Sequence, residues 1–157
     1  MAISHPDWRE MARESMARAD IELASSEDQR LRYAALELRY ALEALIYDLA
    51  WAYRAEIPPE EYKIWQARKL LNLLLTIDPT AGSSSTLLFG KEHEYGVSQP
   101  RDEMKIAGKE FRISAATLKT HYDALGHYLH APSLKDVMEH RLQDADKLRT
   151  RCEEVRG

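Results

Sequence analysis

Apolar residues recur at the spacing of an α-helix throughout residues 31–51. Plotted at about 100° per residue, they form two stripes on nearly opposite sides of the helix. One stripe is aliphatic and the other largely aromatic: Leu31, Ala35, Leu38, Leu42, Leu45 and Leu49, then Tyr33, Tyr40, Ala44, Tyr47 and Trp51. A surface helix buries one face, so a helix that is apolar on two sides must be covered twice. We therefore expect this helix to be central, covered by other helices of the chain or by a second copy of it.

Amphipathic segments before and after this helix predict further helices. Their boundaries are marked by N-capping side chains, which bind the free N–H groups of a first helical turn, and by prolines, which cannot continue a helix. The predicted starts are Asp7, Ser26, Pro58-Pro59, Ser114 and Ser133, and the predicted stops are Pro58-Pro59, Asp78-Pro79 and Pro132. The pattern therefore predicts an all-α fold of about five helices.

Residues 80–103 lack the helical pattern of the segments described above. They contain glycines, a proline and consecutive serines around one apolar cluster, Leu87-Leu88-Phe89. Long loops in compact domains are functional or disordered, and we expect this one to be mobile and without a folding role. Between residues 104 and 113, apolar residues then alternate around Ala107-Gly108. This alternation predicts a small hairpin within 104–113.

The last predicted helix, residues 133–157, keeps a heptad spacing to the end of the sequence. Its seam consists of Leu134, Met138, Arg141, Ala145, Leu148, Cys152 and Val155. A heptad seam is typical of helices that pair with another helix. We therefore divide the chain into a bundle domain, residues 1–132, and a C-terminal heptad helix, residues 133–157, which is able to lead into a further domain.

The bulk composition excludes some classes of function. At 157 residues, one domain is the default, and the net charge of −4 gives no overall basic field to attract nucleic acid. The single cysteine, Cys152, excludes an internal disulfide and a cysteine-rich zinc site, and it favours a reducing, cytoplasmic compartment. No apolar run approaches the roughly 20 residues that span a bilayer, so we expect no membrane association.

Histidines near the end of the fourth predicted helix are the first candidate for chemistry. Asp123, His127 and His130 project within about 60° of one another on a helix, a set of residue types that is able to ligate a metal. The histidine pair lacks the spacing of a zinc protease motif, and no Cys/His group elsewhere adds ligands, so we expect no metal and no other cofactor. A histidine there is also suited to act as a general acid or base. The alternative is that these residues form an ordinary polar helix face without a chemical role.

Three further groups of residues have candidate roles. Arg39 forms an i,i+4 pair with Glu43, which is either an ordinary helical ion pair or part of a site. Lys63, Arg68 and Lys69 form a small basic group that is a candidate for binding nucleic acid. The candidate dimer interface consists of Tyr40, Tyr47 and Trp51 of the aromatic stripe and Leu148 of the heptad seam.

Three segments give the chain a resemblance to HEPN-like helical domains over about residues 26–132. They are RLRYAALELRYALEALIYDLAW at 30–51, KIWQARKLLNLLLTIDP at 63–79 and THYDALGHYLHAP at 120–132. The resemblance implies an antiparallel helical bundle, often dimeric and frequently found in prokaryotic defence and toxin–antitoxin systems. Many members are metal-independent RNases with an arginine four to six residues before a histidine on a late helix.

This sequence departs from that motif, because no arginine lies four to six residues before His127 or His130. The arginine would help to hold the charge of the scissile phosphate, and only an arginine from elsewhere, such as Arg39, is available to replace it. We therefore expect a helical interaction and dimerisation module that forms a homodimer and is able to bind a further protein partner, as part of a prokaryotic defence or toxin–antitoxin type protein. The alternative is a metal-independent RNase that uses His130 or His127 with Arg39.

Overall fold

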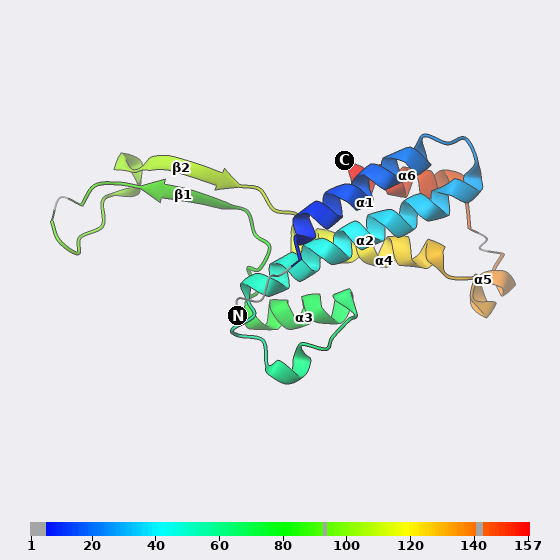
Figure 1. Ribbon diagram of the computed structural model, residues 1–157, viewed down its shortest axis with the longest axis horizontal. Coiled ribbons are helices and arrows are strands. Elements are labelled where there is room, and N and C mark those ends of the chain that lie inside the picture. Colours follow the sequence, from blue (N-terminus) through cyan, green and yellow to red (C-terminus); the bar gives the residue numbers. More distant parts are fainter. Residues whose placement is uncertain (1–5, 93, 141–142) are drawn as a thin grey trace.

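The computed structural model describes residues 6–92, 94–140 and 143–157, and these residues form a helical bundle with one projecting hairpin (Figure 1). The helices are α1 (Trp8–Leu23), α2 (Asp28–Ala52), α3 (Ala67–Ile77), α4 (Ala115–Leu129), α5 (Leu134–Met138) and α6 (Ala145–Arg156). The strands are β1 (Ser85–Phe89) and β2 (Lys105–Glu110), and 3-10 turns occupy Pro59–Glu61 and Arg101–Glu103. The predicted class is therefore confirmed in broad terms, since the fold is mostly helical, but a small sheet is present. No helix among these residues is long and apolar enough to cross a membrane.

The central position predicted for residues 31–51 is confirmed. Helix α2 contacts α1, α3, α4 and α6, and Leu31, Leu38 and Leu42 of its aliphatic stripe are buried. The aromatic stripe is covered less completely. Ala44 lies buried under α1, whereas Tyr40 is 51% exposed. One side of α2 is thus inside the bundle, and the other is covered only in part.

Local capping signals predicted several helix starts correctly. Asp7 accepts a hydrogen bond from the N–H of Glu10, Ser114 accepts one from Thr117, and Ser133 forms a complete capping box with Asp136. The capping box predicted at Ser26 is wrong. Helix α2 has Glu27 at its N-cap without a side-chain capping bond, and Ser25 Oγ instead accepts the N–H of Glu27 at 3.2 Å.

The third helix begins later than predicted. Pro59–Glu61 form a single 3-10 turn, and α3 starts only at Ala67. The intervening backbone is held by a side chain of α2, because the Tyr47 hydroxyl donates to the carbonyl oxygen of Trp65 at 2.8 Å. A tertiary contact therefore fixes a conformation that the local helical pattern did not indicate. The predicted stop at Asp78 is confirmed.

The hairpin has one strand in the segment predicted to be a loop. Strand β1 pairs antiparallel with β2, with Ser85 opposite Glu110 and Phe89 opposite Lys105, and the register shifts between Leu87 and Leu88. The hairpin predicted within 104–113 is therefore wrong, because β2 pairs with a strand outside that range. The plain loop predicted over 80–103 is also wrong, because this segment contains β1. The reason is that the partner of β2 lies far upstream, so a local alternation pattern reveals only one of the two strands. The hairpin projects away from the bundle as an arm (Figure 1).

The last helix is divided rather than continuous. Helix α5 ends at Met138, and His140 adopts the left-handed region with a φ of 54°. Helix α6 then begins after its own N-cap, Asp144, and packs on α1, α2 and α4. Leu134 and Met138 are exposed, Arg141 of the predicted seam lies outside the described residues, and Cys152 is fully buried. Burial raises the pKa of the Cys152 thiol to about 11.

Candidate binding surfaces

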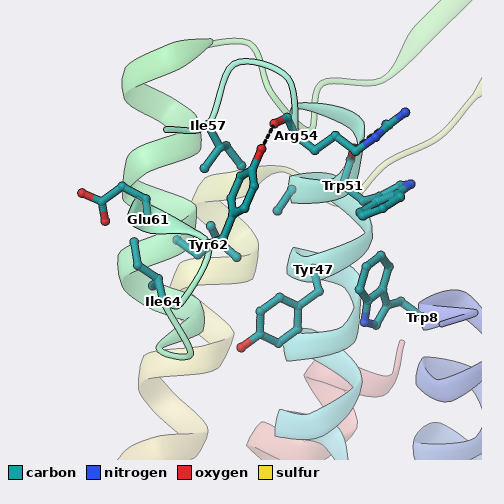
Figure 2. A pocket seen from close by; sticks show the side chains of 10 residues that line it. Trp8, Tyr47, Trp51, Arg54, Ile57, Glu61, Tyr62 and Ile64 are labelled. Atoms are coloured by element: carbon teal, nitrogen blue, oxygen red, sulfur yellow. Dashed lines mark hydrogen bonds between the residues drawn. The ribbon is translucent and has the colours of Figure 1, made fainter. Parts of the chain in front are cut away.

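An aromatic cavity of about 480 Å³ lies where α1, the C-terminal part of α2 and the segment before α3 meet. Trp8, Tyr47 and Trp51 form a continuous wall, with ring centroids 6.4 Å apart for Trp8 and Tyr47 and 5.8 Å apart for Trp8 and Trp51. Tyr62 stands on the other side, where the chain returns toward α3 (Figure 2). Aliphatic side chains complete the lining: Ala50, Ile57, Ile64 and Leu70.

Both tyrosine hydroxyls of the cavity are bound to backbone carbonyls. Tyr47 donates to the carbonyl oxygen of Trp65 at 2.8 Å, and Tyr62 donates to that of Arg54 at 2.7 Å. Burial, and to a lesser extent the charge of Glu43, raises the pKa of Tyr47, so this donor stays protonated at neutral pH. Because the hydroxyls are engaged at the backbone, these residues present mainly their rings to the cavity.

Two charged side chains border the cavity. The Arg54 guanidinium carbon lies 4.7 Å from the centroid of the Trp51 ring, and Arg54 Nη1 donates to the carbonyl oxygen of Trp51 at 2.9 Å. Glu61 lies on the opposite edge. Figure 2 shows both charged groups directed away from the centre, which leaves aromatic and aliphatic surfaces inside.

A smaller groove between α1 and α2 adjoins this cavity. It has a volume of about 320 Å³ and shares Trp8 and Tyr47 with the cavity, while Met11 and Tyr40 line its more exposed part. The predicted interface residues Tyr40, Tyr47 and Trp51 therefore lie along one continuous surface. Leu148 does not join them, because it is 5% exposed and packs in the core of its own chain. The dimer interface itself stays a prediction.

Arg39 of α2 lies in a polar cluster with Glu43 of the same helix and Tyr122 of α4. Arg39 Nη2 donates to the Tyr122 hydroxyl at 2.7 Å, and that hydroxyl donates to Glu43 Oε1 at 2.8 Å. Arg39 Nε also lies 3.7 Å from Glu43 Oε1. Burial and the bond to Glu43 raise the pKa of Tyr122, and the bond from Arg39 opposes this effect. The cluster is a satisfied polar network at the α2–α4 contact.

Gly126 provides the space for the Arg39 guanidinium. A Cβ atom at position 126 would lie 2.3 Å from Arg39 Nη1, a distance that no side chain tolerates without displacing the arginine. His127 follows Gly126 directly, and His130 comes one helical turn later. Packing therefore brings an arginine of α2 to the histidine-bearing end of α4, which the spacing along the sequence does not show.

The side chains of His127 and His130 are exposed, whereas their backbone carbonyls are held from another segment. Gln143 Nε2 donates to the carbonyl oxygens of His127 at 3.1 Å and His130 at 2.8 Å, and Arg32 Nη2 donates to Gln143 Oε1 at 3.0 Å. The last carbonyls of a helix have no partner within it, so Gln143 caps the C-terminus of α4. In the described part of the chain, no hydrogen bond joins either imidazole to Arg39.

The described residues do not bring together a metal-ligating group. Across 6–92, 94–140 and 143–157, no set of three His, Cys, Asp or Glu side chains is placed to hold a metal ion. Asp123, one of the three candidates, lies 3.7 Å from Arg68 Nε in an ion pair between α4 and α3. This pairing gives Asp123 a structural partner instead.

The three basic candidates lie near one another in sequence but have different environments. Lys63 is exposed in the segment before α3, and Arg68 and Lys69 are exposed in the first turn of α3. Because Arg68 pairs with Asp123, its charge is partly neutralised. Nucleic-acid binding by this group stays a prediction.

The sequence pattern did not reveal the cavity as a unit. The sequence predicts a helix from Pro58-Pro59 onward, which includes Tyr62, and it contains no signal that Trp8 packs beside Trp51. The signal that could have indicated the cavity is the concentration of aromatic residues on both sides of Pro58-Pro59. Where the chain reverses its direction at such a site, the aromatic side chains before and after the turn face a common space. The chain matches no protein-family model, no curated protein sequence and no solved structure.

Proposed function

We propose that this chain is a helical interaction module that forms a homodimer, with the β1–β2 arm as its main contact element. The observation that supports this proposal is that the arm carries exposed apolar side chains on both faces. By strand alternation, Leu87 and Phe89 lie on one face, whereas Leu88 and its partner Ile106 lie on the other. Leu87 is 67% exposed and Ile106 is 58% exposed, so neither face is covered within the chain.

Such an arm is suited to being covered by another protein. A two-stranded hairpin alone is marginally stable in water, and an antiparallel sheet usually packs one of its faces against a core. An uncovered apolar arm also leaves strand edges on which a second polypeptide is able to pair. A bound partner would bury this surface and stabilise the hairpin.

Ion pairs at its base attach the arm to the bundle. Arg9 of α1 lies 2.9 Å from Asp48 of α2 and 4.0 Å from Glu110 of β2, and Arg112 lies 2.9 Å from Glu110. These contacts link three segments and restrict the direction in which the arm projects. A preorientated arm loses less conformational entropy on association than a free loop does.

We favour a second copy as the partner because the bundle has exposed aromatic surface of matching character. Tyr40 and Met11 along the α1–α2 groove provide an apolar face for a second arm. A two-fold arrangement would cover arm and groove of both copies at once, and two-fold dimers are the commonest closed assemblies. The resemblance to HEPN-like domains, which are often dimeric, agrees with this choice.

Sedimentation velocity of the full chain tests the proposal. At tens of micromolar, the parent should have twice the 18.1 kDa chain mass. The double variant Leu87→Ser/Phe89→Ser should sediment as a monomer with an unchanged helical circular dichroism spectrum. Lys109→Gln, a polar change on the same arm, is the matched control and should remain dimeric. A monomeric parent at this concentration would refute the proposal.

A second candidate function is metal-independent RNA cleavage, and one specific observation favours it. Cleavage of a phosphodiester requires a proton acceptor and a fixed cation near the developing charge. Histidines are present at 127 and 130, and Arg39 reaches the same end of α4 through the space left by Gly126. Packing thus supports a role for Arg39 in place of the arginine that the family motif has on the histidine-bearing helix.

A further inference from the structure

We propose that the aromatic cavity binds an alkylated ammonium group, the head group of a choline-like molecule or of an N-trimethylated lysine. Four rings line the cavity, from Trp8, Tyr47, Trp51 and Tyr62. This proposal rests on the cavity alone and goes beyond the dimer proposal, which rests on the arm.

The lining disfavours ligands that need many hydrogen bonds. The hydroxyls of Tyr47 and Tyr62 are already donated to backbone carbonyls, and four of the other eight lining residues are aliphatic, namely Ala50, Ile57, Ile64 and Leu70. A sugar, a nucleobase or an anion would leave its own polar groups without partners on entering such a site. A trimethylammonium group has no hydrogen-bond donor or acceptor, so burying it leaves no such group unsatisfied.

The electrostatics of the cavity favour a positive head group over a neutral one of the same shape. The faces of aromatic rings carry negative charge density and attract cations within about 6 Å of their centroids. Helix α2 ends at Ala52, beside the cavity, and the C-terminus of a helix carries partial negative charge. The carboxylate of Glu61 adds a full negative charge at the edge.

The chain itself shows that one ring of this wall accepts a cation. The guanidinium of Arg54 lies 4.7 Å from the Trp51 ring centroid, which is a cation–π contact. Arg54 is directed away from the cavity centre in Figure 2 and so leaves space inside. Its charge nevertheless opposes a second cation nearby, and this opposition provides a distinctive test.

The size of the cavity indicates that more than a head group enters. Its volume of about 480 Å³ lies within the range of sites for small organic ligands. The hydrocarbon part of a ligand would contact Ile57, Ile64 and Leu70 on the α3 side. Both free choline derivatives and a trimethyl-lysine side chain have this composition.

Titration calorimetry of the full chain with three probes tests the ligand class. The probes are choline, a short peptide with N-trimethyl-lysine, and 3,3-dimethyl-1-butanol, which has the shape of choline without its charge. We expect at least one cation to bind about tenfold more tightly than the neutral alcohol. The tighter of the two cations identifies the source of the head group. Equal binding of the alcohol, or no binding of either cation, would overturn the proposal.

Variants at the cavity edge test the electrostatic argument independently of folding. Glu61→Gln should weaken binding of the cation several-fold, and Arg54→Gln should strengthen it several-fold, because the two substitutions remove charges of opposite sign. Tyr62→Leu should reduce affinity about tenfold, whereas Tyr62→Phe keeps the ring and should restore it. Trp65→Phe changes an exposed ring outside the cavity and is the matched control. Unchanged affinity in both charge variants would refute the proposal.

Discussion

The Arg39 guanidinium occupies the space that a side chain at position 126 would fill, since a Cβ atom there would lie 2.3 Å from Arg39 Nη1. Gly126 lies inside α4, where glycine weakens a helix by about 1 kcal/mol relative to alanine. The helix therefore loses some intrinsic stability, and in exchange Arg39 reaches the Tyr122 hydroxyl between α2 and α4.

A double-mutant cycle measures this relationship. In the parent, Gly126→Ala should give none of the usual stabilisation, because the new methyl group displaces Arg39 from Tyr122. In an Arg39→Ala background, the same substitution should stabilise the protein by about 1 kcal/mol. Urea unfolding of the four proteins gives the coupling energy, which we expect to be about 1–2 kcal/mol. Additive effects would show that Arg39 does not depend on the glycine.

RNA cleavage tests the second candidate function. If Arg39 and a late histidine act together, cleavage of a mixed RNA pool should persist in EDTA and fall about 100-fold or more in His130→Ala and in Arg39→Lys. Arg13→Lys, a change at an exposed arginine of α1 that pairs with Glu10, is the control. Cleavage that is abolished by EDTA would instead show a metal-dependent activity and would contradict this candidate function. Inactivity of the parent would leave the interaction module as the proposed function.

Two tyrosines whose pKa values are raised by burial predict a loss of stability at alkaline pH. Burial raises the pKa of Tyr47 and Tyr122 in the folded chain, so the unfolded chain releases these protons first as the pH rises. The stabilisation is fully present below about pH 10, the ordinary tyrosine pKa, and is lost as the pH rises through the raised folded values. Urea midpoints should therefore fall less steeply in Tyr122→Phe than in the parent. An equal slope would show that Tyr122 does not contribute.

Limited trypsin digestion tests the predicted mobility of the connection between the strands. Lys91 lies two residues after the end of β1 and is exposed, whereas Lys105 and Lys109 lie in the hydrogen-bonded strand β2. Proteases cut exposed, flexible backbone first, so the earliest nick should follow Lys91. Mass spectrometry of the first fragments locates the cut. Initial cleavage in α3, at Arg68 or Lys69, would show that the arm is the better protected segment.

What the sequence predicted correctly depended on short-range information. Asp7, Ser114 and Ser133 cap helices through bonds to N–H groups three residues away, and the aliphatic stripe of α2 follows from a period of 3.6 residues. These signals are contained in windows of a few turns. They predicted the central helix and the boundaries of α4 without knowledge of the rest of the fold.

The failures share a different cause. The partner of β2 lies about twenty residues upstream, the start of α3 depends on a bond from Tyr47 to the Trp65 carbonyl, and the break after α5 occurs at a left-handed His140. None of these features is indicated by a periodic pattern of apolar residues in the sequence. The same holds for the sites, because Arg39 meets Gly126 and Trp8 meets Trp51 only after distant segments have packed.

Because Cys152 is buried, the rate at which its thiol reacts with a reagent reports the opening of α6. A thiol with a pKa near 11 and no exposed surface reacts with alkylating reagents only when the helix moves away from the bundle. The rate of labelling therefore reports how often α6 detaches, and no substitution is needed to introduce a labelling site. Helix α6 packs on α1, α2 and α4, so its detachment breaks contacts with three other helices. The labelling rate of Cys152 therefore measures how firmly these helices hold α6 in the bundle.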